Sequence, residues 1–280
     1  MFNSTVLEVA VGMVFCFAAV ALIVSSIYEA IASIFGLRSK TLLTGVKALL
    51  NDDSFSDLAR GIYNHALINP RASGTAETED DLINLPSYID AKDFSTALLD
   101  CIQSGPGDFT KLGDDIEALT DPQLKTLLKG FYVHAQGDAA VLHQKLATWF
   151  DGSMDRVSGA YKRWSQLWCF LIGLLIAALF NIDTFHLFST LWAHPSLAAG
   201  LDTVGMEHAS DAMNHLVALP VGWATFPPEF GRTLFIQLVG WLVTASAALF
   251  GAPFWFDILQ QILKIRVRGT GSKPGTTPTI

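Results

Sequence analysis

The side chains best suited to binding a metal ion lie in one short segment, HASDAMNH. His208, Asp211 and His215 fall within two helical turns of each other there, and imidazole and carboxylate groups are common zinc ligands. Their spacing matches no established ligand signature, and histidine and aspartate are ordinary residues on a solvated helix. We therefore predict no metal and no cofactor, and assign these residues a structural or surface role; a zinc site is the alternative.

Common catalytic constellations are absent from the sequence, which has no Gly-rich phosphate loop, nucleophile elbow, HExxH pair or paired-cysteine motif. The acidic group at Asp114, Asp115 and Glu117 is more simply a helix N-terminus or a solvated face than a metal site. The net charge of −8 offers no clustered basic face for nucleic acid. We predict no catalytic residue and no nucleic-acid partner, and favour a non-enzymatic role over an enzyme.

Three long stretches of the chain carry no charged residue: 9–28, 164–182 and 233–256. Each is long enough to cross a bilayer, and a crossing segment must be helical because its backbone has no water to pair with. Only 16% of all residues are charged, against about 25% in a soluble domain. The sequence therefore predicts an all-α integral membrane protein with three transmembrane helices, in residues 1–37, 164–182 and 233–256.

The distribution of basic residues predicts the orientation. Residues 38–163 hold thirteen of the eighteen Lys and Arg residues, and basic residues near span ends mark the cytoplasmic side. We expect 38–163 to be a helical cytoplasmic domain inserted between the first and second spans, and 257–280 to be a cytoplasmic amphipathic segment with a disordered tail. The N-terminus and the loop 183–232, with its amphipathic helices, are then periplasmic.

Local signals place several elements of the domain. Asp121 with Pro122 at the first helical position opens one helix, and Asp138 opens another that continues into the second span. A short helix is expected to end at Asn69, before Pro70, and the acidic stretch 71–87 is expected to be a linker or mobile loop. Gly251 and Pro253 should kink or interrupt the third span.

Small and polar residues recur along one face of the first and third spans, where they allow another helix to approach closely. We predict these as a helix-packing or oligomer interface: Ser25, Glu29, Gly240, Thr244 and Ala248. For Glu29, at the end of its span, we favour a solvated interfacial carboxylate over an acid in an ion pathway.

Charged residues are also expected to meet at the cytoplasmic interface, at similar depth on different helices: Asp155, Arg156, Lys162, Arg163 and Asp257. Ion pairs within the chain are the favoured interpretation. A cluster that grips a partner, lipid headgroups or a second subunit is the alternative.

Two stretches, WFDGSMDRVSGAYKR before the second span and LFGAPFWFDILQQILK after the third, resemble a widespread family of hypothetical bacterial inner-membrane proteins. The segments NIDT, LPVGW and SSIYEAIASIFGLRSKTLLTGVKALLND extend the resemblance over most of the chain. It implies a bacterial inner-membrane location and brings no activity and no catalytic residues.

These observations favour a membrane anchor, scaffold or accessory subunit that self-associates or docks onto a larger membrane assembly. Its expected partners are the lipid bilayer and either further copies of itself or a membrane complex. An oligomeric channel or transport component is the alternative, although the spans contain almost no ionisable residues.

Overall fold

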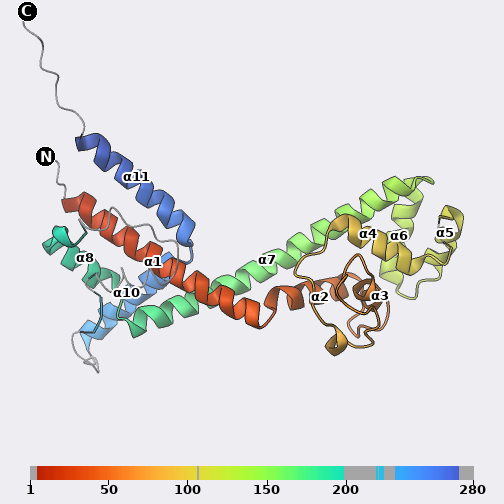
Figure 1. Cartoon of the computed structure of the whole chain (residues 1–280), viewed down its shortest axis with the longest axis horizontal. Helices are drawn as coiled ribbons and strands as arrows, with labels where there is room; N and C mark the ends of the chain where they lie inside the picture. The colour runs from red at the N-terminus through yellow and green to blue at the C-terminus, as the bar shows by residue number, and fades with distance from the viewer. Residues whose placement is uncertain (1–4, 106, 199–218, 220, 224–230, 271–280) are drawn as a thin grey trace, which may run out of the picture. The chain divides into compact units, whose positions relative to one another are not determined.

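The computed structural model describes residues 5–105, 107–198, 219, 221–223 and 231–270, and every regular element in these ranges is helical (Figure 1). The chain divides into two compact units. The inserted unit is Ala32–Arg163, and the terminal unit combines Met1–Ile31 with Trp164–Ile280. The predicted all-α class is confirmed for the described residues.

Helix α7 (Ala139–Leu179) is one unbroken element of 41 residues that contributes to both units. Asp138 opens it by accepting hydrogen bonds from the backbone amides of Ala140 and Val141, at 2.8 and 3.2 Å. The prediction that the last helix of the domain continues into the uncharged stretch is therefore confirmed.

Among the described residues, two helices are long and apolar enough to cross a membrane, α1 (Thr5–Ile34) and α7. The predicted third span instead consists of α10 (Arg232–Ala248) and the start of α11 (Ala252–Thr270). Their apolar parts are bent by 94° and count as a span only if the bent pair is taken as one. Gly251, with φ +81°, lies in the break, where a residue without Cβ adopts the left-handed conformation at little cost. The predicted interruption near Gly251 is confirmed.

The core of the terminal unit is built around α1. Phe15 and Ala18 of α1 are fully buried, together with Ala177 of α7 and Leu191 of α8 (Thr184–Ala193). In the most apolar window of α1, 67% of the residues are buried within the chain, against 17% in that of α7. The two candidate membrane helices therefore have different surroundings.

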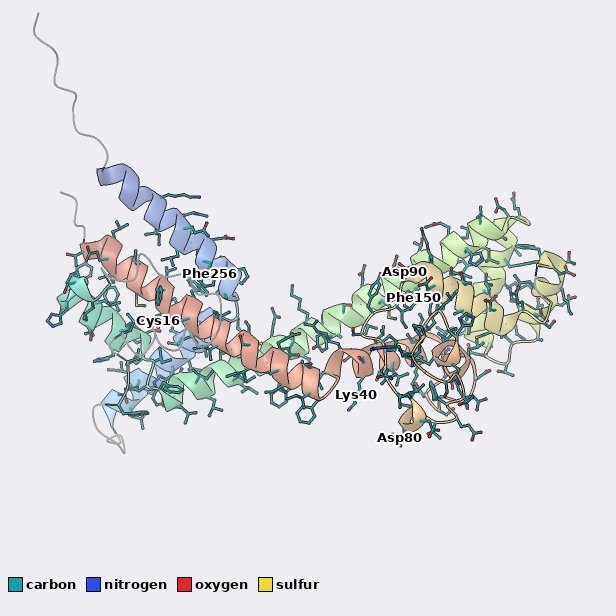
Figure 2. The ribbon with its side chains drawn as sticks, in the orientation of Figure 1. Cys16, Lys40, Asp80, Asp90, Phe150 and Phe256 are labelled. Carbon is teal, nitrogen blue, oxygen red and sulfur yellow. The ribbon has the colours of Figure 1, made fainter. Side chains whose placement is uncertain are left out.

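The inserted unit packs short helices against the first part of α7. Its elements are α2 (Leu37–Leu49), α3 (Leu58–Asn64), η1 (Glu79–Asp81), α4 (Ala91–Ile102), α5 (Phe109–Glu117) and α6 (Pro122–Ala135). In its core Phe94 of α4 stacks on Phe150 of α7 with ring centroids 4.1 Å apart; Phe150 is labelled in Figure 2. Asp121 caps α6 through the amide of Leu124 at 2.6 Å, as predicted.

The segment after α3 differs from the prediction. Helix α3 ends at Asn64 rather than Asn69, because the backbone is extended at His65, with ψ 135°. The Asn64 side chain exchanges two hydrogen bonds of 2.9 Å with the backbone of Ala76. Ala76 and Leu82, both within the predicted stretch 71–87, are buried. The stretch predicted as a linker or mobile loop is therefore packed onto the domain by its few apolar side chains.

Candidate functional site

Three of the predicted helix-packing residues, Gly240, Thr244 and Ala248, lie on the buried side of α10. Helix α10 packs on α8, and a Cβ placed on Gly240 would lie 1.7 Å from Oδ1 of Asp183. Only glycine allows so close an approach. Gly240, Thr244 and Ala248 thus contact other parts of the same chain, and a second copy would have to meet α10 elsewhere.

Thr244 belongs to a buried polar network at the turn between α7 and α8. Its hydroxyl is 0% exposed and lies 2.8 Å from both the Ile182 carbonyl and the Thr184 hydroxyl. The indole of Trp241 donates to Oδ1 of Asn181 at 3.1 Å, and the Asn181 amide donates to the Gly222 carbonyl at 2.9 Å. In an apolar unit such bonds satisfy groups that are costly to bury alone.

Sequence reasoning missed Asn181 and Asp183 as members of this network. The available signal was the segment NIDT, whose polar residues interrupt an apolar stretch directly after α7. Asp183 caps α8 through the amide of Phe185 at 2.9 Å. The NIDT segment is therefore a packing site between helices. Its geometry provides no reactive group.

Ser25 and Glu29, the other two predicted packing residues, are exposed on α1. Ala18, two helical turns before Ser25 on the same face of α1, is fully buried. The face of α1 therefore changes along the helix, from one covered by the chain to one that is open. An intermolecular contact at Ser25 and Glu29 stays a prediction.

The five residues of the predicted charged cluster are all exposed. Asp155, Arg156, Lys162 and Arg163 belong to the inserted unit, while Asp257 lies on α11 of the terminal unit. Arg156 donates a hydrogen bond of 2.9 Å to the Ser153 hydroxyl. Whether the five residues meet stays a prediction.

Two cavities flank the place where α2 crosses α7. At the crossing, a Cβ on Gly45 would lie 2.9 Å from both methyl groups of Val157, so the helices are in close contact. The first cavity, the Arg156 pocket, has a volume of about 330 Å³ and includes Asn51, Trp149 and Arg156 in its lining. The second, the Arg38 pocket, has about 250 Å³ and includes Arg38, Ser158 and Tyr161. Met154 and Val157 line both.

The Arg156 pocket combines a guanidinium, an indole and an amide. Asn51 adopts φ +51° and its amide nitrogen donates toward Asp121 and Gln123 at 3.2 to 3.3 Å. Cavities of about 300 to 1,000 Å³ with a few convergent polar groups are typical of small-molecule sites. The pocket could hold a small polar or anionic group, but its lining contains no nucleophile paired with a base.

Among the described residues of the inserted unit, one serine contacts a histidine, and this pair does not form a catalytic nucleophile and base. Ser95 lies 3.1 Å from Nδ1 of His143, but its hydroxyl donates to the Lys92 carbonyl at 2.8 Å and the residue is 1% exposed. A nucleophile must reach its substrate and give up its proton to the base. Ser95 meets neither condition.

Several titratable side chains of the inserted unit are buried or hold structural hydrogen bonds and ion pairs. Burial, followed by the neighbouring Asp100 carboxylate, raises the pKa of the Cys101 thiol to about 11, which keeps it protonated and weakly nucleophilic. Asp115 binds the Ser104 amide at 2.7 Å, and Glu117 pairs with Lys129. No three His, Cys, Asp or Glu side chains in the described ranges gather as a metal site; His208, Asp211 and His215 lie outside those ranges.

The chain was also compared with known proteins. A scan against protein-family models, a search of curated proteins and a search of solved structures each found no match.

Proposed function

We propose that this protein is a non-enzymatic membrane anchor or scaffold. In this proposal the terminal unit is embedded in a bilayer and the inserted unit is presented at its surface to a partner. The observation that carries the proposal is α7: one continuous helix of 41 residues supplies Leu142, Leu146 and Phe150 to the core of the inserted unit and an exposed apolar face to the terminal unit.

That exposed face supports contact with lipid. It consists of large side chains at helical spacing along the second part of α7: Trp164, Leu167, Trp168, Leu171, Leu175 and Leu179, each at least 43% exposed. An apolar surface of this length is unfavourable in water and matches the hydrocarbon of a bilayer.

The proposed location is a bacterial inner membrane, with the inserted unit and the C-terminus in the cytoplasm and the N-terminus in the periplasm. The basic residues of 38–163 support this orientation. The family resemblance carried by MDRVSGAYKR and GAPFWFD supports the bacterial membrane.

For its partner we propose a second copy, contacted through the open part of α1 at Ser25 and Glu29. Small and polar residues on a membrane helix allow close association, and these two are exposed. A larger membrane complex is the other partner that this surface could serve.

Native mass spectrometry of the full chain in mild detergent tests the association. A dimer or larger oligomer that dissociates when Ser25 is replaced by Leu is the expected result. Ser189→Leu, at an exposed serine of α8, is the matched control and should leave the oligomer intact. A monomer without any co-purifying protein would refute the scaffold.

An oligomeric channel or transport component is a second candidate, which the break between α10 and α11 favours. Interrupted helices form substrate and ion sites in many transporters. This alternative predicts conductance in planar bilayers that changes on replacing the half-buried Gln237 of α10. Purified protein that shows no conductance in planar bilayers would refute the channel alternative.

A further inference from the structure

A third cavity, the His143 pocket, lies between α4, α5 and the start of α7 and has a volume of about 260 Å³. Its apolar lining includes Leu99, Leu112 and Leu142, which belong to the core of the inserted unit. Among the described residues, no Lys or Arg lines it. The volume is slightly below that of typical small-molecule sites, which begin at about 300 Å³. It therefore suits one aliphatic chain with a polar end better than a whole cofactor.

The neutral polar side chains that α4 contributes to the pocket present hydrogen-bond acceptors. The Thr96 hydroxyl donates its proton to the Lys92 carbonyl at 3.0 Å. The Gln103 amide nitrogen donates to Oδ1 of Asp100 at 2.8 Å, which fixes the orientation of the amide. Lone pairs of the Thr96 hydroxyl oxygen and of the Gln103 amide oxygen are therefore left for a ligand.

His143 adds an acceptor whose position follows from its contact with Ser95. The Ser95 hydroxyl has one proton and donates it to the Lys92 carbonyl at 2.8 Å. Its oxygen lies 3.1 Å from Nδ1 of His143, so Nδ1 must carry a proton and donate it to Ser95. A neutral imidazole that is protonated at Nδ1 has a lone pair at Nε2. No described residue bonds to that Nε2.

Two carboxylates make the lining negative. Oδ2 of Asp100 lies 3.3 Å from Nε2 of His65, and Oδ1 of Asp108 accepts from the Lys111 amide at 3.1 Å. A carboxylate has about four lone-pair sites, so both groups can accept further hydrogen bonds. Because the described lining has no basic side chain to balance them, a cationic donor fits this pocket better than a neutral one.

We propose that the His143 pocket binds a primary ammonium group carried on a short aliphatic chain. An ammonium has three donors and no acceptor, which matches a lining that offers acceptors from α4, α7 and the residue before α5. The three leucines pack against the methylene groups, whose removal from water favours binding.

Two ligands share this chemistry, a free alkyl diamine and the lysine side chain of a protein partner. All residues that line the pocket belong to the inserted unit. The inference is therefore independent of the proposed membrane anchoring.

Saturation-transfer difference NMR on the full chain in deuterated detergent tests the site, with 1,5-diaminopentane as the probe. The diamine should give a saturable signal, and 1,5-pentanediol, its neutral counterpart, should give much less. Asp100→Asn should weaken diamine binding about fivefold, the upper end of what an exposed ion pair contributes. The matched control is Asp114→Asn, which removes the same charge from an exposed residue of α5 outside the lining and should bind like wild type.

A second pair of variants tests the cavity without changing the charge. Ala139 and Ala140 are both exposed at the start of α7, but only Ala139 lines the pocket. Ala139→Phe should fill the pocket and abolish the diamine signal, whereas Ala140→Phe should preserve it. Thermal unfolding of both variants should match wild type, because neither residue belongs to the core.

A comparison of probes separates the two sources of the ammonium group. N-acetyl-lysine methylamide carries the same chain and a single ammonium, with the other end blocked as in a protein. Tighter binding of this compound than of the diamine supports a lysine side chain of a partner. Tighter binding of the diamine supports a free diamine.

Three outcomes overturn the inference. Equal signals from the diamine and the diol would mean that the pocket does not recognise the positive charge. Equal losses for Asp100→Asn and Asp114→Asn would mean diffuse attraction to an acidic surface. Undiminished diamine binding by Ala139→Phe would place the bound probe outside the His143 pocket.

Discussion

Among the described glycines, Gly240 is the one at which an added side chain would meet its neighbours most closely. An added Cβ would lie 1.7 Å from Oδ1 and 2.7 Å from Cγ of Asp183. Asp183 cannot simply rotate away, because its carboxylate caps α8 through the Phe185 amide. Gly173 of α7 provides a contrast, since a Cβ there would make ordinary contacts of 3.5 Å or more.

Gly240→Ala is therefore expected to destabilise the terminal unit by about 1–3 kcal/mol, the usual effect of overpacking. Gly173→Ala should be neutral or stabilising, because alanine is the better helix former. Thermal unfolding of the full chain in detergent measures both. Equal melting temperatures for the two variants would contradict the close contact between α10 and α8.

The Asp52 carboxylate is expected to make the free energy of unfolding depend on pH. Burial raises its pKa, but hydrogen bonds from the amides of Ser56, Asp57, Ala59 and Arg60 outweigh burial, and the net pKa is lowered. A pKa that is lower in the folded than in the unfolded protein contributes stability above the unfolded value, about 3.9. That stability is lost as the pH falls through the folded value.

Asp52→Asn should lower the free energy of unfolding by about 1–3 kcal/mol at neutral pH, since an amide nitrogen then faces backbone donors. The difference from wild type should shrink as the pH falls below about 4. Asp53→Asn is the matched control, because Asp53 is the exposed neighbour. Denaturant unfolding across this pH range provides the measurement, and a difference that is independent of pH would contradict the assignment.

At the scale of elements, α1 and α7 differ in how much of their apolar surface the rest of the chain covers. Helix α1 is the more apolar, with a mean hydropathy of 2.6 against 1.2 over the best window. It is nevertheless the helix that the rest of the chain covers. The second part of α7 leaves Trp164, Trp168 and Leu171 exposed, so contact with lipid is tested on that face.

Leu171→Lys places a charge in the middle of that face, where it costs about 2.5–3.5 kcal/mol in a bilayer. We expect a larger share of this variant to be released from membranes by carbonate. Val141→Lys is the matched control, since Val141 is exposed on the same helix but belongs to the inserted unit, and its extraction should equal that of wild type. Unchanged extraction of Leu171→Lys would argue against α7 as a span.

The bend between α10 and α11 is a second feature at the scale of elements. The indole of Trp255 donates to the Ala247 carbonyl at 2.8 Å. It is a second donor to a carbonyl at the end of α10 that also accepts from the Phe250 amide at 3.3 Å. Its ring contacts Phe17 of α1, with centroids 5.0 Å apart. The bend is therefore held by specific contacts in addition to the glycine.

At the scale of the whole molecule, the proposed orientation can be tested with single cysteines. In a background without Cys16, Cys101 and Cys169, we expect an impermeant thiol reagent to modify His194→Cys in intact spheroplasts and to leave Ser73→Cys unmodified until the cells are lysed. Both positions are exposed. Modification of both or neither in intact cells would contradict the positive-inside assignment.

The sequence by itself determined what depends on neighbours along the chain. Uncharged stretches, the caps at Asp121 and Asp138, and the interruption near Gly251 are local, because dihedral preferences, first-turn amides and hydropathy act over a few residues. It also indicated that Gly240 and Thr244 are packing residues, without naming Asp183 or Asn181 as their contacts.

Only the tertiary structure decided which surfaces meet. The closure of Asn64 on Ala76, the approach of Gly240 to Asp183, and the burial of α1 rather than α7 join residues far apart in the sequence. Apolar stretches look alike whether they will face lipid or other helices, since both environments favour the same side chains. The choice between them is made by small residues and polar contacts that fit only when the whole chain is folded.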